Sequence, residues 1–223
     1  MKIIKIKESE IKAVVSQIIK ETNTGMFFKY NEFDALKKQI LTLLLVAFTG
    51  IFSANAQQTV SGVKVDSKLS VEGQSLILNG AGLREKMWID LYVGSLYLPT
   101  KTSNAKDIMD SKDAAAIKLD IVSGMITSEK MISAVNDGFE NATNKNTAPL
   151  KAKIDKFKSF FKEEIKKGDT FIIANVPGQG VVVFKNGVKK GTIDGHDFKR
   201  ALFGIWLGTK PADKDLKEGM LGK

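Results

Sequence analysis

The segment at residues 37–57 limits what can fold in this chain, because it has the three parts of a secretory signal. It opens with two lysines, continues as a mostly apolar run over residues 40–52, and ends in an A-x-A cleavage site at Ala54-Asn55-Ala56. The apolar run is shorter than the roughly 18 to 20 residues that a transmembrane anchor needs. We therefore expect cleavage between Ala56 and Gln57, export to the periplasm or the exterior, and a mature protein without a stable membrane span.

Residues 1–36 need a separate explanation, because an export signal normally begins a chain. A start at Met26 would give a signal of about 30 residues, the usual upper length, and Met1 to Gly25 would then be an artefact of start-site choice. Alternatively, residues 1–20 form an amphipathic helix, since apolar residues are interspersed with lysines there. Neither interpretation brings this N-terminal extension into the fold, so we place the folded domain at residues 57–223, after the signal at 37–56.

The composition of residues 57–223 indicates one domain with its own core and a basic surface. The segment has 26 Lys and Arg against 20 Asp and Glu, a net charge of about +6. Only Arg84 and Arg200 are arginines. Because bidentate reading of bases uses the guanidinium group, we interpret this lysine-dominated surface as solvated and expect no nucleic-acid partner.

Several kinds of chemistry are excluded by the residue types that the sequence lacks. There is no cysteine, which removes disulfides, thiolate nucleophiles and cysteine metal sites. His196 is the only histidine, so a histidine cluster for a metal is impossible, and no G-x-S-x-G motif frames a serine nucleophile for it. Neither a P-loop nor a G-x-G-x-x-G motif opens a helix. We expect no metal and no cofactor.

Alternating apolar residues predict a series of strands. The clearest runs from Met87 to Leu98, where both residue parities are largely apolar, so both faces should be covered. Before it, Asn79-Gly80-Ala81-Gly82 should form a bulge or a tight bend, because glycine permits positive φ or close backbone approach. The other expected strands are one or two within residues 57–72, then Ser75–Leu78, Ala114–Val122, Asp169–Val176, Gly180–Lys185 and Val188–Ile193, with an Asn186-Gly187 hairpin turn before the last.

Helical spacing of apolar residues predicts four helices, with polar caps at three N-termini. They are expected at Ser103–Asp110, Thr127–Asn141, Leu150–Lys167 with Gly168 as its stop, and Asp194–Trp206. The lysines of the third helix indicate a solvated face, with a membrane-binding helix as the alternative. Runs of strands separated by helices favour a single α+β domain, a large antiparallel sheet with helices packed on one face.

Three segments of the domain, taken together, carry a family pattern: Leu78–Lys86 followed by Leu91–Pro99, Gly168-Asp169 with Pro177–Gly180, and Ile193–Gly195 through Ala201–Gly208. Their order and spacing resemble those of the bacterial chalcone isomerase-like proteins, in a superfamily that also holds plant chalcone isomerases and plastid fatty-acid-binding proteins. The resemblance implies an open-faced β-sandwich, in which a ligand cleft lies between a large antiparallel sheet and a layer of helices.

The resemblance also implies that most catalytic positions of the plant isomerases have changed. Arg84 matches the family's arginine, but Val93 stands at its threonine, Thr127 about at its tyrosine, and Ala134 near its asparagine. Valine and alanine cannot donate hydrogen bonds to developing charge, and losing one such donor typically costs roughly 10²–10³ in rate. We therefore expect no true chalcone isomerase activity.

Arg84 is the strongest candidate for binding a ligand. A guanidinium can hold a carboxylate bidentately, and Tyr92 or Tyr97 of the following strand could add a hydroxyl. This resembles the binding mode of the fatty-acid-binding branch. Our candidate ligand-binding residues are Arg84, Tyr92, Tyr97 and Thr127. The alternative is a structural Arg84, paired with Glu85, Asp90 or backbone carbonyls at the bend.

Three functions follow from these residues. The first is an exported, non-catalytic carrier of a small lipophilic carboxylate such as a fatty acid. The second is a divergent isomerase, an intramolecular lyase that uses Thr127, Tyr92 or Tyr97 in altered roles. The third is an envelope structural or interaction protein with a filled cleft, where Trp88 and Trp206 are core residues. An open cleft beside Arg84 would separate the first two functions from the third.

Overall fold

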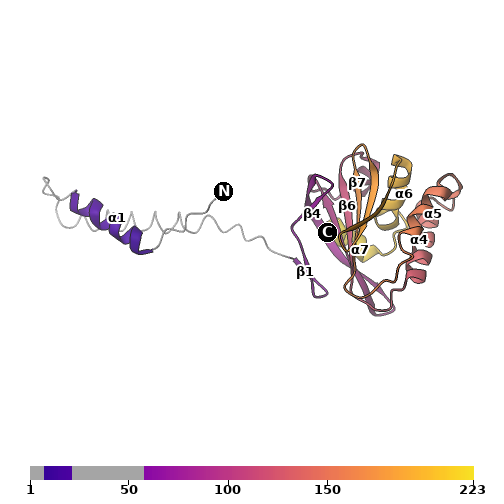
Figure 1. Ribbon diagram of the computed structural model, residues 1–223, viewed down its shortest axis with the longest axis horizontal. Coiled ribbons are helices and arrows are strands. Elements are labelled where there is room, and N and C mark those ends of the chain that lie inside the picture. Colours follow the sequence, from indigo (N-terminus) through magenta and orange to yellow (C-terminus); the bar gives the residue numbers. More distant parts are fainter. Residues whose placement is uncertain (1–7, 22–57) are drawn as a thin grey trace. The chain divides into compact units, whose positions relative to one another are not determined.

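The computed structural model describes residues 8–21 and 58–223, and the chain divides into two units, Met1–Ala54 and Asn55–Lys223 (Figure 1). The expected signal at 37–57, its cleavage site and the start at Met26 lie outside the described residues. In the first unit, helix α1 spans Glu8–Glu21 and exposes apolar side chains, which matches the alternative of an amphipathic helix in this region. The choice of start site stays a prediction.

A seven-stranded antiparallel sheet is the centre of the second unit. Each strand pairs with the next along the chain, in the order β3-β4-β5-β6-β7-β8-β9. A short hairpin of β1 and β2 precedes it. The strands are β1 (Gln58–Val60), β2 (Val63–Val65), β3 (Lys68–Val71), β4 (Gln74–Lys86), β5 (Ile89–Leu98), β6 (Ala115–Ile121), β7 (Thr170–Val176), β8 (Gly180–Lys185) and β9 (Val188–Ile193).

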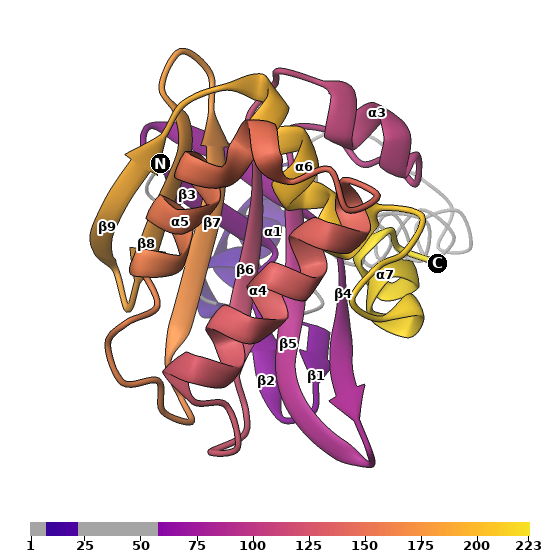
Figure 2. The ribbon, with the colours of Figure 1, turned by 90° about the vertical axis from the view of Figure 1, so that its right-hand side faces the viewer.

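The helices lie against one face of this sheet, as Figures 1 and 2 show. The main core fills the space between the two layers, and Phe139, Phe157 and Phe198 pack against one another at its centre. This arrangement confirms the predicted α+β class and the single helix layer. No helix in residues 8–21 and 58–223 is long and apolar enough to cross a bilayer. The helices of the domain are α3 (Ala105–Asp110), α4 (Ser128–Ala142), the 3₁₀ turn η1 (Ala148–Leu150), α5 (Lys151–Ser159), α6 (His196–Leu207) and α7 (Lys214–Met220).

The predicted helix caps are confirmed in one case and corrected in two. Thr127 caps α4, since its side chain accepts a hydrogen bond from the backbone of Lys130. Helix α3 is capped by Asn104 instead of Ser103, and α6 by Gly195 instead of Asp194. Gly195 has φ of 102°, a conformation that favours glycine and that an aspartate would adopt at a cost.

The helix predicted over Leu150–Lys167 was too long, because α5 ends at Ser159. Beyond it, Phe161 and Ile165 are buried, and Phe161 packs on Phe171 of β7 with ring centroids 5.0 Å apart. Beyond Ser159, burial of these side chains in the core therefore decides the backbone conformation, although their spacing is that of a helix. Gly168 lies at the approach to β7, where its N–H donates to the carbonyl of Ile121, and is not a helix stop.

The glycine-rich segment predicted to form a bulge or a tight bend is part of one continuous strand, β4. The register shifts between Leu78 and Gly80, which confirms the predicted bulge. Its glycines serve close approach. A Cβ on Gly80 would lie 2.2 Å from the carbonyl oxygen of Gly219, and one on Gly82 would lie 3.0 Å from the Cα of Leu216. Both contacts are with α7, a helix that the sequence analysis did not predict. The glycines let α7 pack directly on the backbone of β4.

The strand predicted from Met87 begins two residues later. Met87 and Trp88 form the loop of the β4–β5 hairpin, with φ of 52° and 65°, and are 81% and 94% exposed. The expectation that both faces are covered is therefore wrong at this end and right from Tyr92 onward, where residues of either parity are buried. The sequence signal failed because neither loop residue is a typical turn former.

Candidate functional site

A cavity of about 600 Å³ lies between the sheet and the helix layer. Strands β4, β5 and β6, helices α4 and α6, and the segment before α7 contribute its walls. Its exposed lining residues come from the β4–β5 hairpin, from α4 and from Met125 in the loop before α4. The cavity therefore opens between the hairpin and this helix with its preceding loop. The volume lies within the range of small-molecule sites, about 300–1,000 Å³. The space beside Arg84 is therefore open, which argues against the hypothesis of a filled cleft.

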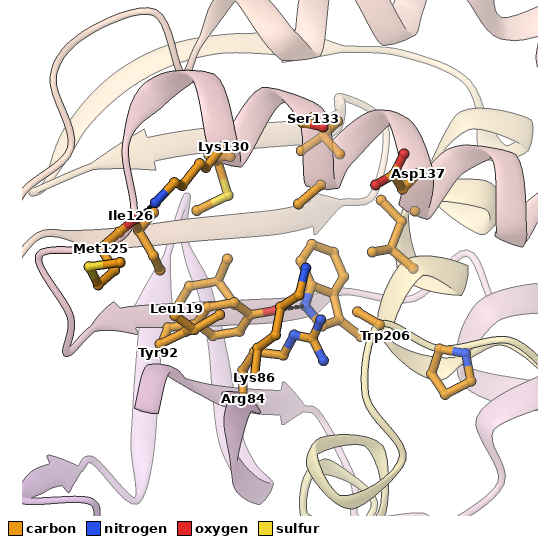
Figure 3. A pocket seen from close by; sticks show the side chains of 18 of the residues that line it. Arg84, Lys86, Tyr92, Leu119, Met125, Ile126, Lys130, Ser133, Asp137 and Trp206 are labelled. Atoms are coloured by element: carbon orange, nitrogen blue, oxygen red, sulfur yellow. Dashed lines mark hydrogen bonds between the residues drawn. The ribbon is translucent and has the colours of Figure 1, made fainter. Parts of the chain in front are cut away.

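Two of the candidate residues, Arg84 and Tyr92, lie together in this cavity. They are direct cross-strand partners on β4 and β5. Cross-strand partners have Cβ atoms only about 4.5–5.5 Å apart, so their side chains act as one group on the cavity face. Figure 3 shows both side chains beside Trp206 of α6.

Arg84 is also paired with an acid, though with neither Glu85 nor Asp90. Its Nη1 donates to Oδ2 of Asp213 at 3.0 Å, and both side chains are mostly buried. Asp213 caps α7, where its other oxygen accepts from the backbone of Leu216. Among the described residues, Nη1 makes the only hydrogen bond of the Arg84 side chain, so Nη2 and Nε keep their protons for a ligand.

Tyr92 is arranged to donate a hydrogen bond into the cavity. Its hydroxyl oxygen accepts from Nε1 of Trp206 at 3.0 Å, and the structure gives its own proton no acceptor among the described residues. Burial raises the pKa of Tyr92, and the nearby Asp213 raises it further, against the lowering effects of Trp206 and Arg84. The phenol therefore stays protonated at neutral pH and above.

The rest of the cavity is mainly apolar with a positive rim. Its walls include Leu91, Leu119, Ile126, Met131, Val135 and Ile205. Three basic residues, Arg84, Lys86 and Lys130, and one acidic residue, Asp137, line it as well. In the part of the chain that the structure describes, no group of three or more acidic or histidine side chains could hold a metal ion. The arrangement suits a lipophilic anion, with its polar end at Arg84 and Tyr92.

The other two candidate residues lie outside the cavity. Tyr97 is fully buried on the opposite face of the sheet, where its hydroxyl donates to the carbonyl of Asp66 at 3.0 Å and burial raises its pKa. Thr127 is the exposed cap of α4. Of the two apolar replacements, Val93 is buried on the opposite face, whereas Ala134 lines the cavity.

Sequence reasoning missed two polar members of the site, Trp206 and Asp213. The sequence places Trp206 on the apolar face of its helix, which favours a core residue, and a buried Nε1–H leaves no separate signal in the sequence. Asp213 lies in a segment for which no helix was predicted. An aspartate three residues before an apolar position is a possible N-cap signal, and it would have placed α7.

The comparisons with known proteins agree with this geometry. The model of the chalcone isomerase-like family matches residues 57–222. Fatty-acid-binding protein 1 of Arabidopsis thaliana is 25% identical over 178 residues, and the match covers 67% of this chain and 64% of that protein's length.

A crystal structure of an Arabidopsis thaliana fatty-acid binding protein has the same fold. It superposes with a TM-score of 0.58 at 21% identity, over 72% of this chain and 92% of that one. The likeness confirms the expected large antiparallel sheet with helices. Because the family model spans almost the whole of the folded unit, this chain belongs to the chalcone isomerase-like family.

Proposed function

We propose that this protein is a non-catalytic carrier that binds a small lipophilic carboxylate, of the fatty-acid class, in the cavity beside Arg84. The observation that carries the proposal is the open cavity of about 600 Å³ with apolar walls and with Arg84 and Tyr92 at one end. The relative named as a fatty-acid-binding protein supports the same class of ligand.

The polar end of the cavity suits a carboxylate in particular. Arg84 offers Nη2 and Nε, and Tyr92 offers its hydroxyl proton, so three donors can meet two carboxylate oxygens. Asp213 compensates part of the charge of Arg84, yet Lys86 and Lys130 keep the lining positive. A neutral ligand would leave this excess charge unpaired.

The chain carries few of the groups that would turn such a site into an isomerase. Val93 points away from the cavity and Thr127 lies outside it, so two of the family's polar positions are not available to a ligand. Ala134 lines the cavity without a hydrogen-bonding side chain. These positions support binding over turnover. We also propose, from the segment at 37–57, that the carrier is exported.

The test measures binding of a long-chain fatty acid to the purified domain by calorimetry. Native mass spectrometry of the same protein detects any lipid that co-purifies with it. Arg84→Ala should weaken binding about tenfold or more, because a charge-assisted pair is lost. The matched control is Arg200→Ala, since Arg200 is an exposed arginine that pairs with Asp110 and does not line the cavity. Binding that is absent, or equal in both variants, would refute the proposal.

Asp213→Asn separates a ligand-binding Arg84 from a merely structural one. Asparagine caps helices as well as aspartate does, so α7 should stay in place. Removing the acid leaves the charge of Arg84 uncompensated, and fatty-acid affinity should rise several-fold while affinity for the matching fatty alcohol should not. An equal loss for both ligands would indicate that Arg84 only holds α7. Chalcone turnover that Arg84→Ala abolishes would favour the isomerase instead.

A further inference from the structure

The tip of the β4–β5 hairpin exposes large apolar side chains at the mouth of the cavity. Trp88 is 94% exposed and Met87 is 81% exposed, and Met125 in the loop before α4 is 52% exposed. In Figure 2 this hairpin and the loop before α4 both reach the lower end of the domain. Exposed apolar residues gathered at one end of a domain mark an interaction surface more often than scattered ones do.

The backbone at this tip is strained, which singles it out further. Four hairpins among the described residues have two-residue loops with positive φ at both positions. Three of these loops end in glycine: Ser61-Gly62, Glu72-Gly73 and Asn186-Gly187. The fourth is Met87-Trp88, although left-handed backbone is unfavourable for bulky residues. A strained position that is kept without a packing gain points to a use of the side chain itself.

The tip is continuous with the ligand cavity. Met87, Ile89 and Met125 are exposed and also line the cavity, so an apolar path runs from the outer surface to its interior. Trp88 does not line the cavity and is free to contact something outside the domain. A lipophilic ligand could enter along this path without crossing water.

The two lysines that line the cavity mouth favour an anionic lipid surface as the partner. Lys86 adjoins Met87, and Lys130 lies at the other side of the mouth, where its Nζ donates to the carbonyl of Met125 at 3.0 Å. Three acids, Glu85, Asp90 and Glu129, also lie near the tip in the sequence, but none of them lines the cavity. The carboxylate of Asp90 accepts a hydrogen bond from the hydroxyl of Ser61 at 2.5 Å. Tryptophan favours the boundary between lipid and water, and lysines beside it extend to the headgroups.

We propose that the Met87-Trp88 tip inserts into the interface of an anionic membrane and holds the cavity mouth against the lipid for ligand exchange. The inference rests on the proposed function, since the exchanged ligand is the lipophilic carboxylate. The free energy comes from burial of exposed apolar area together with attraction of Lys86 and Lys130 to the headgroups.

The experiment is flotation of residues 57–223 with vesicles of equimolar phosphatidylcholine and phosphatidylglycerol, and with phosphatidylcholine alone. The wild-type protein should bind the anionic vesicles, less so at high salt, with a blue shift of Trp88 emission. Trp88→Gly, which suits φ of 65°, should keep the fold and reduce vesicle binding roughly tenfold or more. Lys86→Glu should also reduce it. The matched control is Val188→Ser, at a 60% exposed residue beside another hairpin loop.

Fatty-acid affinity is measured in the same samples without vesicles. Loss of vesicle binding in Trp88→Gly with unchanged fatty-acid affinity supports the proposal. Wild-type protein that binds fatty acid but no vesicles overturns it and leaves the carrier function in place. Vesicle binding without any fatty-acid affinity supports membrane binding by the tip and overturns the carrier function. If the wild-type protein binds no vesicles and forms a dimer that Trp88→Gly dissociates, the membrane proposal is overturned, and the partner of the tip is a second copy of the chain.

Discussion

Replacing the strained tip with the turn sequence used elsewhere in the chain should stabilise the protein. In Met87→Asn/Trp88→Gly the loop becomes the Asn-Gly pair already present between β8 and β9. A left-handed conformation costs an ordinary residue about 1–2 kcal/mol, and asparagine and glycine avoid most of that cost. The new glycine costs about 0.5–1 kcal/mol of this gain, because it raises the conformational entropy of the unfolded chain. The removed side chains are 81% and 94% exposed, so little packing is lost.

The net gain should be about 1–2 kcal/mol in the free energy of unfolding, which for a domain of this size raises the Tm by about 2–8 °C. Urea denaturation and calorimetry of residues 57–223 would measure both quantities. The matched control is Met87→Ala/Trp88→Ala, which removes the apolar groups and keeps residues with a Cβ at positive φ, so it should gain little. Equal stabilisation by both pairs, or none by Asn-Gly, would refute the argument from backbone strain.

Three further changes test the supports of the site. Tyr92→Phe leaves the buried Nε1–H of Trp206 without its acceptor and should cost about 1–3 kcal/mol in urea denaturation. Gly80→Ala places a Cβ against the backbone of α7 and should cost about 1–3 kcal/mol by the same measurement, with Ser75→Ala on the same strand as a control. Lys199→Met should destabilise the fold, because Nζ of Lys199 donates to three backbone carbonyls around the end of α3. Burial lowers the pKa of Lys199 to about 8 from 10.5, so between these pH values the unfolded wild-type chain binds more protons than the folded one. The free energy of unfolding of the wild type therefore rises with pH in this range, and its excess over that of Lys199→Met should grow from pH 8 to 10.5.

The sheet could be predicted from the sequence almost strand by strand, because alternation and turn residues are local signals. Strands β8 and β9 have the predicted bounds, and Asn186-Gly187 is the turn between them. Errors arose where a long-range contact decided the structure or where the local turn signal is absent. Burial of Phe161 ended α5 early, and the loop at Met87-Trp88 carries none of the residues that normally mark a turn.

Only part of the site could be predicted, again because local signals do not show which distant elements pack together. Arg84 could be found because it matches the family's arginine, and Tyr92 because it lies on the strand that follows. The structure shows that they are cross-strand partners. Tyr97 is not a member of the site, because it lies on the other face of the sheet. Tyr92 and Tyr97 are an odd number of residues apart on one strand, and this separation alone places their side chains on opposite faces. Trp206 and Asp213 come from α6 and the cap of α7, and no local pattern shows that these elements meet β4 and β5.

The polar end of the cavity depends on the packing of α7 as well as on the residues inside the cavity. Gly80 and Gly82 admit α7 to the backbone of β4, and this contact brings its cap, Asp213, within 3.0 Å of Arg84 across 129 residues of sequence. The acid fixes one nitrogen of the guanidinium and leaves the others toward the cavity. A substitution at Gly80 should therefore raise carboxylate affinity in molecules that remain folded, as Asp213→Asn should, because displacing α7 would move away the acid that partly neutralises Arg84.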